Sequence, residues 1–121
     1  MSSINDTLAQ LEKIDGFLGA ALVDCDSGMS LGSVGGNGSL NLEVAAAGNT
    51  EVMRAKRKTM ASLNLRDEIE DMLITLGKQY HLIRPLRTRQ GVFFYLALDR
   101  ARANLAMARL TLGDCEKEIQ L

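Results

Sequence analysis

Side chains that could carry out chemistry are few in this sequence. Its only histidine is His81, and its two cysteines, Cys25 and Cys115, lie far apart. A nucleophilic thiol needs a neighbouring base, and no motif pairs a histidine with either cysteine. A metal site needs a compact cluster of Cys and His ligands, which the sequence lacks. We therefore predict no metal site, and we interpret His81 as a structural residue on a strand.

Carboxylates are plentiful but have no partner for acid–base work. Glu68, Glu70 and Asp71 form a dense group that precedes an apolar run. No candidate general acid accompanies them, and the motifs G-x-S-x-G and H-E-x-x-H are absent. Charge at this position instead suits the start of an edge strand, where it discourages uncontrolled pairing. We predict that the protein is not an enzyme and has no cofactor.

A glycine-rich segment, GGNG at 35–38, raises the question of a phosphate-binding loop. In a Walker loop, lysine and then serine or threonine follow the glycines directly, because the lysine must reach the phosphates. Here SLN at 39–41 follows instead. The segment is therefore predicted to be a loop, and Ser39 or Asn41 is predicted to cap the helix after it.

Composition limits the remaining classes of function. The 121 residues carry a net charge of −1, with 46% hydrophobic and 24% charged side chains, as in a soluble globular protein. We predict a single domain over residues 1–121. The balanced charge gives no reason to expect nucleic acid, and no apolar run is long enough to span a membrane. The absence of a secretory signal and of cysteine pairs favours the cytoplasm.

One segment is predicted to organise the rest of the fold. Val92–Leu98 is apolar at every position, which is typical of a strand covered on both faces in the middle of a sheet. Tyr80–Arg87 is predicted to be the strand before it, with a reversal at Thr88–Gly91.

Helix and strand signals divide the remaining chain. Ser3, with Asp6 three residues later, predicts a capped helix that ends near Ile14–Asp15, before Gly16. The other predicted elements are strands at Phe17–Asp24, Met29–Val34 and Asp67–Leu76, a helix ending near Leu63 and a last helix from Asn104. The buried stripe predicted for the long second helix consists of Leu42, Ala45, Ala46, Val52, Met53, Met60 and Leu63.

The second predicted helix also carries a group of cations. Arg54, Lys56, Arg57 and Lys58 follow closely on one another. One interpretation is a solvated face whose charges complement the helix dipole. The other is a docking surface for an acidic partner, for which Arg54, Arg57 and Lys58 are the candidate residues.

The order of the elements, helix–strand–strand–helix–strand–strand–strand–helix (αββαβββα), together with four strings of residues, resembles the roadblock / dynein light-chain domain family. The resemblance covers nearly the whole chain. The strings are GAALVD at 19–24 with the turn at 26–28, YHLIRPL at 80–86, FYLALDR at 94–100 and RANLAMAR at 102–109.

The resemblance implies an α+β fold of the roadblock, profilin-like type. Five antiparallel strands would form one sheet, with the long second helix on one face and the terminal helices on the other. Family members pair as homodimers or heterodimers through their third strands, with the second helices side by side. The residues expected at such an interface are Ala46, Ala47 and Thr50 on the helix and Ile69, Asp71 and Leu73 on the edge strand.

The function that this resemblance implies is that of a non-enzymatic adaptor. Some dock on dynein, and several bacterial members regulate a small Ras-like GTPase as a scaffold or an activating partner. The resemblance therefore implies a dimeric GTPase regulator. The alternatives are a protein-binding scaffold without a GTPase partner and a small-molecule sensor, which would need a concave apolar pocket with a few inward polar groups.

Overall fold

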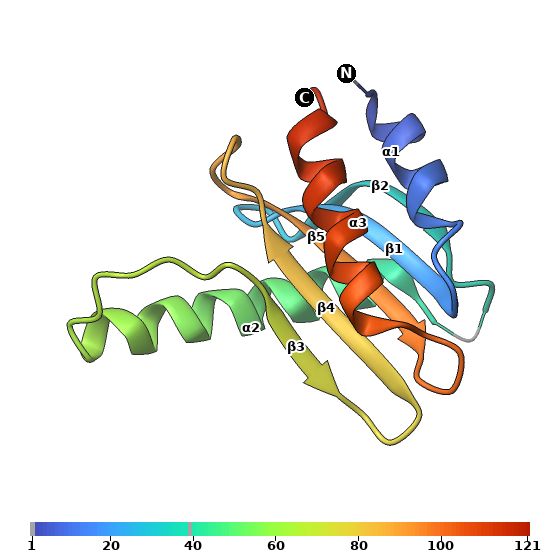
Figure 1. The fold of residues 1–121 in the computed structure, drawn as a ribbon. Coiled ribbons are helices and arrows are strands. Elements are labelled where there is room, and N and C mark those ends of the chain that lie inside the picture. The colour runs from blue at the N-terminus through green and yellow to red at the C-terminus, as the bar shows by residue number, and fades with distance from the viewer. Residues whose placement is uncertain (1, 39) are drawn as a thin grey trace.

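Helices cover both faces of a five-stranded antiparallel sheet (Figure 1). The structure, a computed structural model, describes residues 2–38 and 40–121. Two helices, α1 and α3, lie on one face, and α2 lies on the other. The elements are α1 (Ile4–Leu11), β1 (Phe17–Asp24), β2 (Met29–Gly35), α2 (Leu42–Ser62), β3 (Met72–Thr75), β4 (Gln79–Pro85), β5 (Val92–Asp99) and α3 (Leu105–Glu118). This order and these layers confirm the predicted αββαβββα fold.

The strands are arranged in the order β2-β1-β5-β4-β3. β5 is therefore the central strand, as its unbroken apolar sequence predicts, and it pairs with β1 and β4 on its two sides. Its side chains alternate between two cores. Phe94, Leu96 and Leu98 pack under α1 and α3, while Phe93 and Tyr95 pack on the α2 face. A strand that supplies both cores can expose almost none of its length, and all its residues up to Leu98 are buried.

The predicted cap of α1 is confirmed, but its predicted end is wrong. The Ser3 hydroxyl accepts from the Asp6 N–H while the Asp6 carboxylate accepts from the Ser3 N–H, which completes a capping box. The helix ends at Leu11, three residues before Ile14. Beyond Leu11 the Ile14 N–H bonds back only three residues, to the Leu11 carbonyl, so the chain tightens and leaves the α-helix.

The hairpin of β1 and β2 is closed by the predicted turn. The Asp24 carboxylate accepts from the Asp26 N–H and from the Ser27 hydroxyl, which is the local bonding expected of an Asx turn. Gly28 adopts a φ of +74°, a conformation that a residue with a Cβ rarely takes.

The caps of the other two helices agree with the sequence. The Asn41 side chain accepts from the N–H groups of Glu43 and Val44 and so caps α2. The alternative cap, Ser39, lies outside the described residues. Asn104 caps α3 in the same way.

The strand predicted at Asp67–Leu76 is much shorter in the structure. β3 comprises only Met72–Thr75, and its first pair is Met72 opposite Ile83. Two further steps in this register would place residue 70 opposite Pro85, which has no N–H to donate. The Leu86 N–H points the other way and bonds to Val92 in β5, so the nitrogen of Pro85 faces the β3 side. The ladder therefore stops near Met72, and the acidic residues before it remain outside the sheet.

Candidate partner-binding surface

Only the first half of α2 is seated on the sheet. Its buried residues are Leu42, Ala46, Thr50 and Met53, and none after Met53 is buried. The helix packs mainly on β1 and β2, and Figure 1 shows its second half extending beyond the sheet. That half therefore depends on its own helical bonds, or on a partner, for its stability.

The outer side of α2 and the segment after it expose apolar side chains. Val44 is 67% exposed and Val52 39%, and both lie off the buried stripe. Leu63 is 62% exposed and Leu65 51%. The prediction that Val52 and Leu63 belong to the buried stripe is wrong. Val52 points away from the sheet although its neighbour Met53 is buried, and Leu63 follows the last buried residue of the helix. These four side chains are therefore candidates for the apolar part of a partner-binding surface.

The edge strand β3 adjoins this surface. Among the described residues, β3 pairs only with β4, so the outer N–H and C=O groups of its four residues have no strand beside them. Its side chains Met72, Leu73 and Ile74 are only partly buried. Ile69, in the segment before it, packs partly against the core on the α2 face.

The six residues predicted for a dimer interface differ in their exposure and in their contacts. Ala46 and Thr50 are 0% and 1% exposed, so they face this chain's own sheet and cannot form a contact surface. The Thr50 hydroxyl donates to the Ala46 carbonyl. Ala47, one residue along the helix, is exposed. Asp71 accepts from Arg109 in α3, with 3.0 Å between Oδ2 and Nε. Ile69 and Leu73 are partly exposed, so a partner can still contact both.

Arg54 differs from the other two candidate docking residues. Its Nη2 donates to the carbonyls of Cys25 at 2.8 Å and Asp26 at 2.9 Å, and its Nη1 donates to Glu51. Arg54 thus fastens α2 to the turn between β1 and β2, while its side chain remains 49% exposed. Arg57 and Lys58 are exposed and form no hydrogen bond or ion pair with residues 2–38 or 40–121.

His81 is held in a structural hydrogen-bond network on the α2 face. Its Nε2 lies 2.7 Å from the Gln79 side-chain oxygen and its Nδ1 lies 3.2 Å from the Tyr95 hydroxyl. Burial lowers the pKa of His81 and raises the pKa of Tyr95 to about 12. Both groups therefore stay neutral near pH 7. This arrangement fixes β4 against β5.

Neither cysteine is placed for catalysis. Cys25 and Cys115 are both free and buried. Burial, with the nearby charges of Asp114 and Glu118, raises the pKa of Cys115 to about 11, which keeps it a thiol rather than a reactive thiolate. Within residues 2–38 and 40–121, no group of three or more Cys, His, Asp or Glu side chains is arranged to hold a metal ion.

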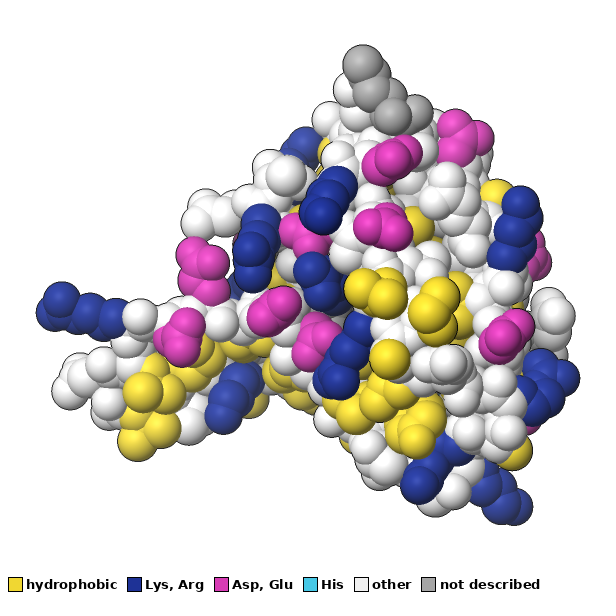
Figure 2. Space-filling model, in the orientation of Figure 1, with side chains coloured by type: hydrophobic (Ala, Val, Ile, Leu, Met, Phe, Trp, Pro, Cys, Tyr) yellow, Lys and Arg dark blue, Asp and Glu magenta, His cyan; other side chains and the backbone are white. Residues whose placement is uncertain are grey.

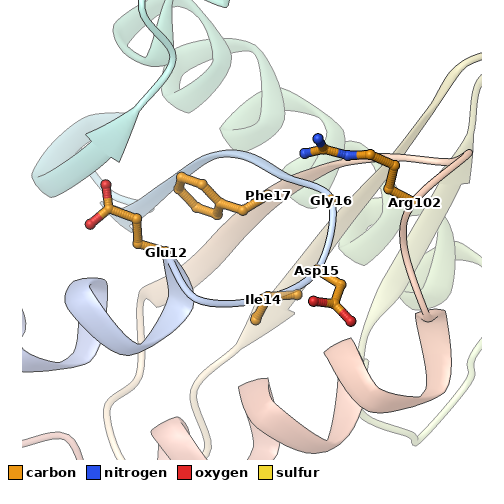
Figure 3. Close-up of a pocket in the computed structure, with 6 residues that line it drawn as sticks. All are labelled: Glu12, Ile14, Asp15, Gly16, Phe17 and Arg102. Atoms are coloured by element: carbon orange, nitrogen blue, oxygen red, sulfur yellow. The ribbon is translucent and has the colours of Figure 1, made fainter.

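Two open hollows on the surface do not have the form of a sensor pocket. The hollow in Figure 3, of about 440 Å³, is lined by Glu12, Ile14, Asp15, Gly16, Phe17 and Arg102. Its charged groups spread around the Phe17 ring rather than converging on one point. The second hollow, of about 570 Å³, is lined by Arg66, Asp67, Glu68, Glu70 and Arg87. Charged residues make up half of the lining of the first hollow and all of the lining of the second, whereas a ligand pocket is mostly apolar.

Solved structures with the same arrangement decide the fold. Over 95% of this chain and 83% of the other, the structure superposes on Myxococcus xanthus MglB with a TM-score of 0.82 and 18% sequence identity. It also matches a Roadblock/LC7 domain from Streptomyces avermitilis, with a TM-score of 0.82 and 13% identity over 96% and 93% of the two chains. This chain has the roadblock fold. The gliding protein MglB from Thermus thermophilus is similar as well, with a TM-score of 0.77 and 14% identity over 93% and 82%.

The roadblock fold is recognised here by structure rather than by sequence. No protein-family model matches the chain, and no curated protein matches it in sequence. In the described part of the chain, no helix is long and apolar enough to cross a membrane.

Sequence reasoning missed several exposed apolar residues of this roadblock chain. The predicted elements assign no role to Val44, Leu65 or, on the opposite face, Leu110, although each breaks the alternation between apolar and charged positions expected of a solvated helix or loop. An apolar residue about half a turn away from the buried stripe is the signal that would have identified Val44 and Leu110, whereas Leu65 lies beyond the end of α2 and gives no such signal.

Proposed function

We propose that this roadblock chain forms a homodimer and acts, without enzymatic activity of its own, as an adaptor that binds and regulates a small Ras-like GTPase. The observation that carries the proposal is the exposed apolar side of α2 beside an unpaired edge strand. These two features lie on the same side of the molecule and need the same kind of partner, a second copy related by a twofold axis.

The edge strand supplies the backbone part of the proposed contact. Antiparallel pairing of two β3 strands would satisfy their outer N–H and C=O groups and join two sheets into one. Because β3 has only four residues, its ladder alone would be short. Side chains on α2 must therefore contribute most of the stability of the dimer.

The second helix supplies the apolar part. Two copies of α2 side by side would bury Val44 and Val52, with Ala47 allowing the helices to approach closely. Complete burial of a valine or leucine side chain contributes about 1.5–3 kcal/mol. The projecting residues Leu63 and Leu65 would then contact the partner's edge strand β3, whose apolar side chains are only partly buried within a single chain.

Exposed cations on α2 support an acidic partner. Arg57 and Lys58 stay free for docking because neither bonds within the described residues, and a twofold axis would present them twice. A surface of this kind attracts an oppositely charged protein and speeds its association. Binding that is stronger to one arrangement of the GTPase switch loops would shift their population, without a residue donated to the GTPase active site.

The dimer is tested by light scattering coupled to size exclusion. A dimer has twice the mass of the 13.2 kDa chain, and Val52→Glu is expected to shift it to the monomer because two carboxylates would be buried at the axis. Leu31→Glu is the matched control, since Leu31 is an exposed apolar residue on β2, at the opposite edge of the sheet from β3. A wild-type monomer, or a dimer that survives Val52→Glu, would contradict the proposed interface.

The GTPase partner is tested by co-purification with the Ras-like GTPases of the source organism, each loaded with GDP or a GTP analogue. The expected result is nucleotide-dependent binding and a changed rate of GTP hydrolysis, both reduced by the charge reversals Arg57→Glu and Lys58→Glu. A dimer that binds none of these GTPases in either nucleotide state would instead favour the scaffold without a GTPase.

A further inference from the structure

The outward face of α3 carries an apolar patch that the core does not use. Its members are Ala106, Met107 and Leu110, which are all exposed and lie at the spacing of one helix side. Met107 is 55% exposed and Leu110 61%. The buried side of the same helix is a different set, which includes Ala108, Leu112 and Cys115. Figure 2 shows hydrophobic side chains gathered over α3 and continuing toward β3 and β4.

We propose that this surface, the α3 patch, docks an amphipathic helix with acidic residues from a protein partner. A helix that lays its apolar side on such a surface uses anchors three or four positions apart. Met107 and Leu110 are larger than the alanines beside them and largely exposed, so they can enter the grooves of a facing helix at a short interaxial distance. Methionine suits such a contact because its unbranched side chain adapts to the partner.

Charges around the α3 patch indicate the sign of the partner. Two acidic groups at its border are already paired, Asp71 with Arg109 at 3.0 Å and Asp99 with Arg102 at 3.7 Å. Lys78, in the turn between β3 and β4, has no carboxylate partner among the described residues.

Arg100 adds a second positive charge that no carboxylate among the described residues neutralises. Its Nη1 donates to the Leu76 carbonyl at 2.9 Å, and its guanidinium lies 5.2 Å from the centre of the Tyr80 ring. These contacts hold the guanidinium in place beside Leu76, which is 41% exposed. The rim of the patch therefore has an excess of positive charge next to apolar surface, and acidic residues beside the apolar anchors of a partner would complement both.

The same features favour a protein helix over the other occupants. An anionic membrane surface would gain little from this patch, because two large apolar side chains give little insertion. A second copy of this chain that docked through the same patch would bring two rims with the same excess of positive charge together, which is unfavourable. Because α3 and α2 lie on opposite faces of the sheet, the proposal does not depend on the proposed dimer or GTPase.

The test uses the full chain and three fluorescent peptides of about four helical turns. The first peptide has leucines at alternating spacings of three and four, with glutamates at most other positions. The second replaces the glutamates with lysines, and the third scrambles the order of the first. Fluorescence anisotropy measures affinity, and amide chemical shifts locate the binding site. Only the acidic amphipathic peptide is expected to bind, with shifts at residues 103–110 and 76–80.

Matched variants separate apolar contact from charge. Met107→Lys and Leu110→Lys are each expected to weaken binding of the acidic peptide about tenfold, which corresponds to the loss of one anchor. Each adds a positive charge that would by itself strengthen attraction, so weaker binding identifies the lost apolar contact. Met29→Lys is the control, because Met29 is 68% exposed on β2. Lys78→Glu is expected to weaken binding and to reduce its dependence on salt.

Four results would overturn the proposal. The first is equal binding of the acidic peptide to wild type, Met107→Lys and Leu110→Lys, and the second is equal binding of the lysine peptide. The third is binding of phosphatidylglycerol vesicles without binding of the acidic peptide, which would identify a membrane surface. The fourth is a loss of oligomer mass in Leu110→Lys, which would identify a second copy as the occupant.

Discussion

This chain closes the sheet face under α1 and α3 by itself, whereas it closes the face under α2 only in part. On the first face, α1 and α3 meet at the two ends of the chain, where the Ser2 N–H donates to the Glu118 carbonyl and the Gln120 N–H to the Ser2 carbonyl. On the second face, no residue of α2 after Met53 is buried. Both faces therefore have a buried core, but on the second face half of the covering helix has no buried residue.

An ion pair reinforces the face under α1 and α3. Arg84 of β4 donates from Nε to the Glu116 carboxylate at 2.8 Å, and the other Glu116 oxygen accepts from the Arg87 N–H at 2.7 Å. The side chains of Arg84 and Glu116 are only 14% and 7% exposed. From the difference between the faces we predict that changes on the α1 and α3 side affect monomer stability, whereas changes in the second half of α2 affect mainly association.

The largest expected effect is a loss of monomer stability from a change in the core under α1 and α3. Phe94→Ala removes a fully buried ring between β5 and the terminal helices, and it is expected to lower the free energy of unfolding by about 3–5 kcal/mol. Urea unfolding at two protein concentrations measures this loss, which should be the same at both.

The matched change on the other side is Leu63→Ala. Because Leu63 is 62% exposed, its truncation is expected to change monomer stability by less than about 0.5 kcal/mol, while weakening any dimer. If Leu63→Ala destabilised the monomer as much as Phe94→Ala, the contrast between the two faces would be wrong.

A smaller loss is expected from Glu116→Gln. The change leaves the guanidinium of Arg84, which is largely buried, without its carboxylate, and removes a charged acceptor from the Arg87 N–H. Breaking such a pair is expected to cost about 3 kcal/mol, at the low end for buried pairs because the site is not fully enclosed. The free energy of unfolding in urea measures it. Glu51→Gln, which alters an exposed pair with Arg54, is the control and should change stability by less than about 1 kcal/mol. Equal losses in the two variants would show that burial of the pair does not matter.

The smallest effect is a pH dependence that arises on the α2 face. Burial lowers the pKa of His81 in the folded protein below the usual 6.5. Between these two pKa values the unfolded chain binds a proton that the folded chain does not, so stability falls as the pH falls below about 6.5. The slope due to this group cannot exceed about 1.4 kcal/mol per pH unit. Urea unfolding between pH 5 and 7.5 should show a slope that is smaller in His81→Gln, and an unchanged slope in that variant would exclude His81 as its source.

The sequence predicted the elements better than their ends. Val92–Leu98 was identifiable as the central strand because seven apolar positions in a row are sufficient evidence of burial on both faces. The length of β3 was not predictable in the same way. It depends on the register with β4, which places residue 70 opposite Pro85, and register is a property of two strands rather than of one.

The candidate site was harder to predict than the fold. On a helix, the neighbouring residues Ala46 and Ala47 differ by about 100° in direction, so identical residues occupy opposite environments, one buried and one exposed. Which one faces the sheet depends on how the helix is rotated. Arg54 could not be assigned from its neighbours either, because its two backbone acceptors lie 28 and 29 residues away in sequence.

Pro85 has a further consequence, for the behaviour of the protein in a crowded cell. Strands of other molecules can pair with the free backbone groups of an open sheet edge, and this pairing is the first step of amyloid-like aggregation. By ending the β3–β4 ladder near Met72, this imino acid limits the exposed edge to four residues. One matching strand can cover an edge of this length completely, whereas an unrelated extended chain would form only a few backbone hydrogen bonds with it. Pro85, on the neighbouring strand β4, thus protects the protein against uncontrolled aggregation.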